Sequence, residues 1–150
     1  MDLVFKNSTT DRKYTSKFFE KILDAGVREL KIGKMKVGIS VNLVGEAKIR
    51  ELNDKYRHKN QVTDVLSFPM DGKYTIQDTQ YTIHDFGDLF ICLPFAKSEA
   101  KRENIDMERK LMQLTVHGFL HLAGYDHEKS ASEAKKMFKL EKQILGKVNF

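Results

Sequence analysis

The segment from His117 to His127 constrains the fold of this chain more than any other stretch, because it contains three of the five histidines. His117 and His121 are four residues apart. On an α-helix this is about 6 Å of rise and about 40° of rotation, so both imidazoles project from one face. Gly124 can adopt the positive φ that ends a helix, and the chain can then turn back and bring His127 toward the same point. The sequence therefore predicts a helix that ends near Gly124 and a loop that returns across its end.

Three neutral imidazoles in this arrangement can fill three corners of a tetrahedron around zinc and leave the fourth for water or substrate, as in catalytic zinc sites. Two histidines four residues apart are weak evidence alone, since either can be an ordinary core or surface residue. A third histidine, with a glycine where the helix must stop, favours a metal site. We predict one Zn²⁺ per chain, with His117, His121 and His127 as its ligands.

The predicted helix carries a polar stripe among apolar neighbours. At about 100° per residue, this stripe consists of Lys110, Gln113, His117, His121 and Gly124. Two interpretations remain open for its first two members. Either Lys110 and Gln113 are simply solvated, or they line a groove that leads to the metal.

The histidine spacing is that of the metzincin zinc proteases, His-Glu-x-x-His-x-x-Gly-x-x-His. Gly118 stands where those enzymes carry their general base, so no obvious residue beside the first histidine can deprotonate an attacking water. The full string, His-Gly-x-Leu-His-Leu-x-Gly-Tyr-Asp-His, instead closely resembles the signature of the YbeY family. These are bacterial zinc-dependent endoribonucleases linked to ribosomal RNA maturation.

The resemblance covers roughly residues 40–145. Its other landmarks, in family order, are Leu52, Asn53, Tyr56, Arg57, Thr63 through Phe68, Gly87, Asp88, Leu89, Met137, Phe138 and Glu141. Gln113 is a departure, because many YbeY relatives carry a further histidine there, and this leaves the role of position 113 open. The resemblance implies an α+β fold, with a small mixed β-sheet packed against several helices. The three-histidine metal site would lie at the end of a central helix and in the loop after it.

Arg57 is the candidate catalytic residue. A guanidinium holds a phosphate through two hydrogen bonds and offsets charge that develops in a phosphoryl transition state. The resemblance implies that an arginine at this position is essential to catalysis. From the residues alone, an ion pair with Asp64 or another loop acid competes with that role.

Four acidic residues have more than one possible role. Asp64 and Asp88 either orient a ligand imidazole or form turns before strands, and the turn is the favoured interpretation. Asp126, beside the last histidine, has the same two interpretations. Glu141 lies on a helix face that otherwise points inward, so we expect an ion pair or a contact behind the site rather than direct catalysis.

Hydrophobic periodicity predicts the order of helices and strands. Strands are expected at residues 3–5 and 35–43, in a short segment that Pro69 ends, in a small hairpin of 74–76 and 81–83 around residues 77–80, and at 89–93. Helices are expected at residues 16–30, 46–56, 94–102 and 107–123, with another after the capping pair Ser130 and Glu133.

Length and composition limit the number of domains and the class of protein that this chain can be. A chain of 150 residues suits one domain, residues 1–150, that can fold without a disulfide or a metal. The net charge of +5 slightly favours an anionic partner. Cys92 is the single cysteine and lies in an apolar run, so we expect a buried structural thiol. No apolar stretch is long enough to span a membrane or to serve as a signal peptide, which predicts a cytoplasmic protein.

We therefore predict a single-strand-specific, zinc-dependent endoribonuclease that acts in rRNA maturation and ribosome quality control. Its expected partners are single-stranded RNA, chiefly rRNA, and the small ribosomal subunit, with no membrane and no DNA. One alternative is a metalloprotease or another zinc hydrolase with the same histidines. Another is a non-catalytic, zinc-containing ribosome-binding factor, which the lack of a visible base favours and the open fourth metal position disfavours.

Overall fold

The computed structural model describes residues 1–75, 80–148 and 150. The strands are β1 (Asp2–Asn7), β2 (Lys36–Val44), β3 (Val65–Thr75) and β4 (Thr82–Cys92). The helices are α1 (Ser16–Glu29), α2 (Glu46–Arg57), α3 (Leu93–Glu103), α4 (Met107–Leu122) and α5 (Ala131–Leu145). This confirms the predicted α+β class.

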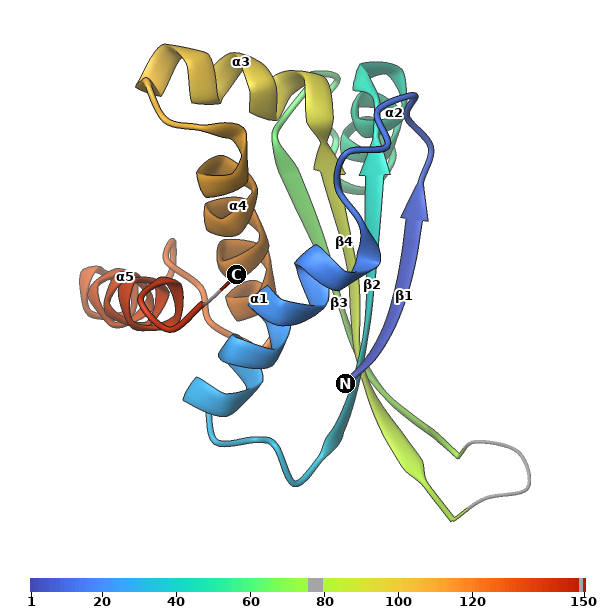
Figure 1. Cartoon of the computed structure of the whole chain (residues 1–150), viewed down its shortest axis with the longest axis vertical. Helices are drawn as coiled ribbons and strands as arrows, with labels where there is room; N and C mark the ends of the chain where they lie inside the picture. The colour runs from blue at the N-terminus through green and yellow to red at the C-terminus, as the bar shows by residue number, and fades with distance from the viewer. Residues whose placement is uncertain (76–79, 149) are drawn as a thin grey trace.

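The described strands form one mixed sheet in the order β1-β2-β4-β3. β2 pairs in parallel with both β1 and β4, whereas β3 and β4 are antiparallel. β1 and β3 are therefore the edges of the sheet. The far ends of β3 and β4 project beyond the helices (Figure 1).

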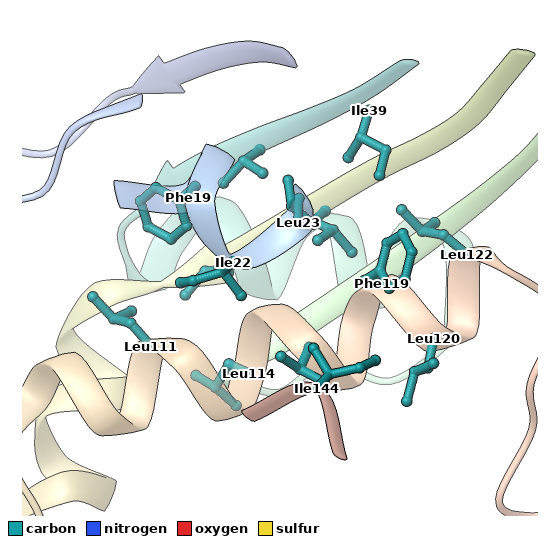
Figure 2. Packing of buried hydrophobic residues seen from close by; sticks show 14 of the residues in the cluster. Phe19, Ile22, Leu23, Ile39, Leu111, Leu114, Phe119, Leu120, Leu122 and Ile144 are labelled. Atoms are coloured by element: carbon teal, nitrogen blue, oxygen red, sulfur yellow. The ribbon is translucent and has the colours of Figure 1, made fainter. Parts of the chain in front are cut away.

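The main core lies between the sheet and the helices α1 and α4, with α5 packed against both helices (Figure 1). Alternate residues of β2 face this core, and Val37, Ile39, Val41 and Leu43 are all buried, as their period of two predicted. Side chains of α1 and α4 meet between the two helices. The core residues labelled in Figure 2 include Phe19, Ile22 and Leu23 of α1 and Leu111, Leu114 and Phe119 of α4.

A smaller core lies on the other face of the sheet, under α2. Ile49 and Leu52 of α2 pack there with Leu66 and Cys92. Cys92 is fully buried, and burial raises the pKa of its thiol. The predicted burial of this cysteine is confirmed.

The strand boundaries after residue 65 were predicted wrongly. β3 does not end at Pro69 but continues to Thr75, and β4 runs without a break from Thr82 to Cys92. The two strands form one long hairpin whose register shifts between Pro69 and Gly72. Proline is tolerated at such an irregularity on an edge strand because no ladder hydrogen bond is needed from it. The expected turn at residues 77–80 lies largely outside the described residues.

Helix α4 positions the candidate site. Its first turn is capped by Asp106, whose side chain accepts a hydrogen bond from the Arg109 backbone N–H at 2.7 Å. The helix approaches the sheet closely at Gly118, where an added Cβ would lie 2.7 Å from Leu89 Cδ2 and 3.3 Å from Ser67 Oγ. Position 118 faces the sheet, so its glycine is explained by packing.

Candidate metal centre and groove

His117, His121 and His127 meet where α4 ends. The first two lie one turn apart on the helix, with ring centroids separated by 4.7 Å. Gly124 has a φ of +101°, as the sequence required, and the chain turns back there. The ring of His127 then lies 5.1 Å from each of the other two. One nitrogen from each imidazole falls within 4.8 Å of the other two, close enough to share one metal ion.

The local geometry fits zinc. Two nitrogen ligands of a tetrahedral zinc ion lie about 3.4 Å apart, given Zn–N bonds of about 2.05 Å. The Nε2 atoms of His117 and His121 are separated by 3.1 Å. Nδ1 of His127 is buried and finds no hydrogen-bond partner in the described part of the chain, so other contacts do not occupy this atom. Three imidazoles without a thiolate are also the donor set of open, catalytic sites.

The surroundings of His121 favour its neutral form. Burial is the largest influence that lowers its pKa below the ordinary value, and the neighbouring His117 and His127 lower the pKa further. A neutral imidazole has a free lone pair, which metal binding requires. The cluster is thus suited to bind a cation near neutral pH.

Glu141 reaches the cluster from α5. Its Oε1 lies 2.5 Å from Nδ1 of His117. In the neutral tautomer that this contact favours, Nδ1–H donates to the carboxylate and Nε2 keeps its lone pair for a metal. The expected contact of Glu141 with the site is therefore present, through His117.

A groove of about 960 Å³ contains the cluster. The polar stripe of α4 lines it, including Lys110 and Gln113, so the groove interpretation of the stripe is correct. Lys110 is not solvated, since only 6% of the residue is exposed. Its Nζ lies 2.7 Å from Glu103 Oε2 and 3.6 Å from Glu99 Oε1 on α3.

Arg57 lies in the same groove, at the C-terminal end of α2. Its Nη2 donates to the Ser67 carbonyl oxygen at 3.2 Å, which ties the guanidinium to β3. The alternative ion pair with Asp64 is not formed between these two described residues. A guanidinium has five N–H donors, so this single contact leaves donors for a ligand. The structure thus brings Arg57 and the three histidines to one groove.

Asp64 keeps a local role and does not reach a histidine. Its Oδ1 accepts a hydrogen bond from the Val65 N–H at 2.7 Å, which fits the favoured turn interpretation.

The carboxyl group of Glu99 has a raised pKa. Burial, followed by the neighbouring Asp64 carboxyl, raises the pKa of Glu99 to about 7, and Lys110 offsets this rise only in part. Glu99 therefore keeps its proton to a higher pH than an exposed glutamate does.

The other two aspartates also do not orient a histidine. Asp88 lies in β4 and its Oδ1 accepts from Ser40 Oγ at 2.5 Å, so it is neither a histidine partner nor a turn former. Asp126 accepts from the Glu128 backbone N–H at 2.9 Å, within the loop that carries His127. This contact shapes the loop.

Sequence reasoning missed two features of the groove. The first is the burial of Lys110 with its acidic partners on α3, because a helix face does not reveal which other helix covers it. The second is Phe138 of α5, which lines the groove with 52% of its surface exposed. The signal for Phe138 was available, since it lies three residues before Glu141 and thus on the same helix face.

Comparisons with known proteins identify the family of this chain. The family model described as Endoribonuclease YbeY matches residues 4–149. A relative named Endoribonuclease YbeY from Persephonella marina is 39% identical over 134 residues, which are 89% of this chain and 84% of the relative. One of the same name from Sulfurihydrogenibium is 36% identical, over 97% of this chain and 91% of its own.

Among solved structures, the chain is similar to a Thermotoga maritima protein determined in solution. The TM-score is 0.60 at 28% sequence identity, over 96% of this chain and 89% of that protein. The likeness extends over nearly the whole fold.

Proposed function

This chain belongs to the YbeY family, and on that premise we propose that it is a zinc-dependent endoribonuclease that cleaves single-stranded RNA. We further propose that residues 1–150 form one catalytic domain. The observation that carries the proposal is the convergence of three imidazoles and one guanidinium in a single groove. This arrangement joins a metal-binding donor set to a phosphate-binding side chain.

His117, His121 and His127 would hold the ion. When bound, zinc would supply Lewis-acid polarisation of water or of a phosphoryl oxygen. Glu141 contacts Nδ1 of His117, so it would orient this imidazole and leave Nε2 available to a bound ion.

Arg57 would hold the scissile phosphate. The Ser67 carbonyl fixes one N–H of its guanidinium, and the remaining donors can contact two phosphate oxygens at once. Because that contact strengthens as negative charge develops, Arg57 would stabilise the transition state more than the bound substrate.

We propose ribosomal RNA as the substrate class, with roles in rRNA maturation and ribosome quality control. The small ribosomal subunit would then be the partner, and the cytoplasm would be the place of action. The family relationship supports this proposal, and the net charge of +5 is compatible with an RNA partner.

The decisive experiment compares one RNA sequence in single-stranded form and in a duplex. We expect cleavage of the single strand that a chelator abolishes and zinc restores, with little cleavage of the duplex. His117→Ala should remove the activity. His58→Ala should retain it, because the exposed His58 lies next to Arg57 in sequence but does not line the groove.

The rival functions give different results. Chelator-sensitive cleavage of casein would favour a metalloprotease. Tight RNA binding without cleavage at any zinc concentration would favour a non-catalytic ribosome-binding factor. Either outcome would overturn the proposed activity.

A further inference from the structure

Phe138 is a large apolar side chain in an unusual position. Its neighbour Met137 is fully buried in the main core, as is Ile144 on the same helix, whereas Phe138 remains 52% exposed. Of the exposed large apolar side chains in the described ranges, Phe138 is the one that lines the histidine groove. Packing of α5 does not account for this placement, so a ligand in the groove is the better explanation.

The residues of α5 that line the groove lie on one face of the helix. Phe138, Glu141, Lys142 and Leu145 follow the i, i+3, i+4, i+7 spacing of one helix face. Glu141 contacts His117, so this face is joined directly to the candidate metal centre. Lys142 is exposed and lies one turn from Phe138, about 6 Å along the helix. An aromatic ring and an ammonium group are thus available side by side.

The charge of the groove indicates which ligand chemistry this pair suits. Its basic residues are Arg57, Arg109, Lys110 and Lys142, and its acidic residues are Asp64, Asp126, Glu128 and Glu141. The side chains thus carry opposite charges in equal number, so attraction of a polyanion into the groove would come chiefly from a zinc ion bound at the histidines. A nucleotide that lies along α5 gains from a contribution that does not depend on net charge. Stacking of an unpaired base on an aromatic ring supplies such a contribution.

We propose that Phe138 is the stacking platform for one unpaired base of the RNA substrate and that Lys142 contacts the phosphate of the same nucleotide. This inference rests on the proposed function and names the part of the site that distinguishes single strands. A base in a duplex is stacked on its neighbours and cannot lie against Phe138 unless it is first extruded. The preference for single strands therefore arises from α5, whereas the histidines and Arg57 act on a phosphate that every RNA carries.

The test measures binding and cleavage of a short single-stranded RNA by the zinc-loaded protein, with RNA integrity checked on a gel. Phe138→Ala should weaken binding by about 5- to 100-fold, the range seen when stacking aromatic residues are removed. The variant should raise KM with little change in kcat. Phe138→Trp should restore binding, and Phe138→Leu should restore little, because leucine keeps apolar bulk without a ring face.

A second arm replaces single bases of the RNA by abasic sites. At one position this replacement should weaken binding to the wild-type protein, and it should have no further effect on Phe138→Ala. Tyr74→Ala is the matched control, since Tyr74 is 45% exposed but does not line this groove, and it should bind as the wild type does.

Equal RNA affinity of the wild type and Phe138→Ala would overturn the stacking proposal and leave Phe138 as a contact for a protein partner. This failure is distinct from failure of the proposed function. In that second case the wild-type protein would not cleave the RNA at all, whatever residue stands at position 138.

Discussion

Glu141 of α5 contacts His117 of α4, with Oε1 at 2.5 Å from Nδ1. The two residues are distant in sequence, and the packing of α5 against α4 brings them together. A metal ligand on one helix is thus oriented by a carboxylate on another. The part of α5 around Glu141 therefore belongs to the candidate site even though it carries no predicted metal ligand.

Replacing Glu141 tests this relationship. Glu141→Ala should weaken zinc binding by about 10- to 100-fold, the usual effect of losing a carboxylate that orients a histidine ligand. Glu141→Gln should lose less, because its amide oxygen can still accept the Nδ1–H bond. Competition with a zinc chelator measures the affinity, and Glu108→Gln on the exposed first turn of α4 is the control. Wild-type affinity in Glu141→Ala would restrict this residue to a packing role.

The three histidines are expected to bind one zinc ion per chain. Each of His117→Ala, His121→Ala and His127→Ala should lower occupancy sharply while the domain stays folded. Elemental analysis of the purified variants measures the occupancy. Chelation of the wild type should lower the Tm but leave one cooperative transition, because the apolar core does not depend on the ion. Full occupancy in all three variants would remove the metal centre from the proposal.

Arg57→Ala should separate cleavage from binding. Loss of its contact to the phosphate in the transition state should cost roughly 3–4 kcal/mol, which is about 100- to 1000-fold in cleavage rate. RNA affinity should fall much less, and Arg57→Lys should restore only part of the rate because lysine lacks the planar fork. Single-turnover cleavage and equilibrium binding on one RNA at one salt concentration give the comparison.

A matched control for Arg57 is available on the same helix. Arg50 is exposed on α2 and does not line the groove, so Arg50→Ala should cleave normally. Equal losses of binding and cleavage in Arg57→Ala would make Arg57 an anchoring residue rather than a catalytic one.

Local features of the site could be predicted from the sequence. Helix geometry alone places His117 beside His121, and the stop after α4 follows from the positive φ that only Gly124 in that segment adopts easily. The expected helix at residues 107–123 differs from α4 by one residue. These predictions succeeded because each depends on residues a few positions apart.

Features that depend on contacts between separate helices and strands could not be predicted. The order of the strands, the register shift beyond Pro69 and the pairing of Lys110 with Glu103 all involve parts of the chain that periodicity treats separately. Gly118 illustrates the difference. From the sequence, Gly118 indicated a missing general base. In the structure, an added Cβ there would overlap Leu89 of β4, which indicates close packing of the helix on the sheet.

Gly118→Ala tests the packing explanation. Alanine is favoured over glycine inside a helix by about 1 kcal/mol, but the added carbon would overlap Leu89 Cδ2 at 2.7 Å, and overpacking costs about 1–3 kcal/mol. The difference between these two terms is a net loss of up to about 2 kcal/mol in the free energy of unfolding, measured by urea denaturation. Gly33→Ala, whose added carbon meets nothing within 4 Å, should change stability by less than about 0.5 kcal/mol. A stabilised Gly118→Ala would contradict close packing there.

Glu99 should make stability depend on pH. Burial and the neighbouring Asp64 raise its pKa in the folded protein from 4.5 to about 7. Between these two values the folded state keeps a proton that the unfolded state has lost, so rising pH favours unfolding through this window. Glu99→Gln mimics the protonated side chain and removes this dependence. The Tm of Glu99→Gln relative to wild type should therefore be higher at pH 8 than at pH 5, by the equivalent of about 1–3 kcal/mol. Titrating groups that do not contact Glu99 contribute equally to both proteins and cancel in the difference, so an unchanged difference between pH 5 and pH 8 would show that Glu99 is already ionised in the folded state.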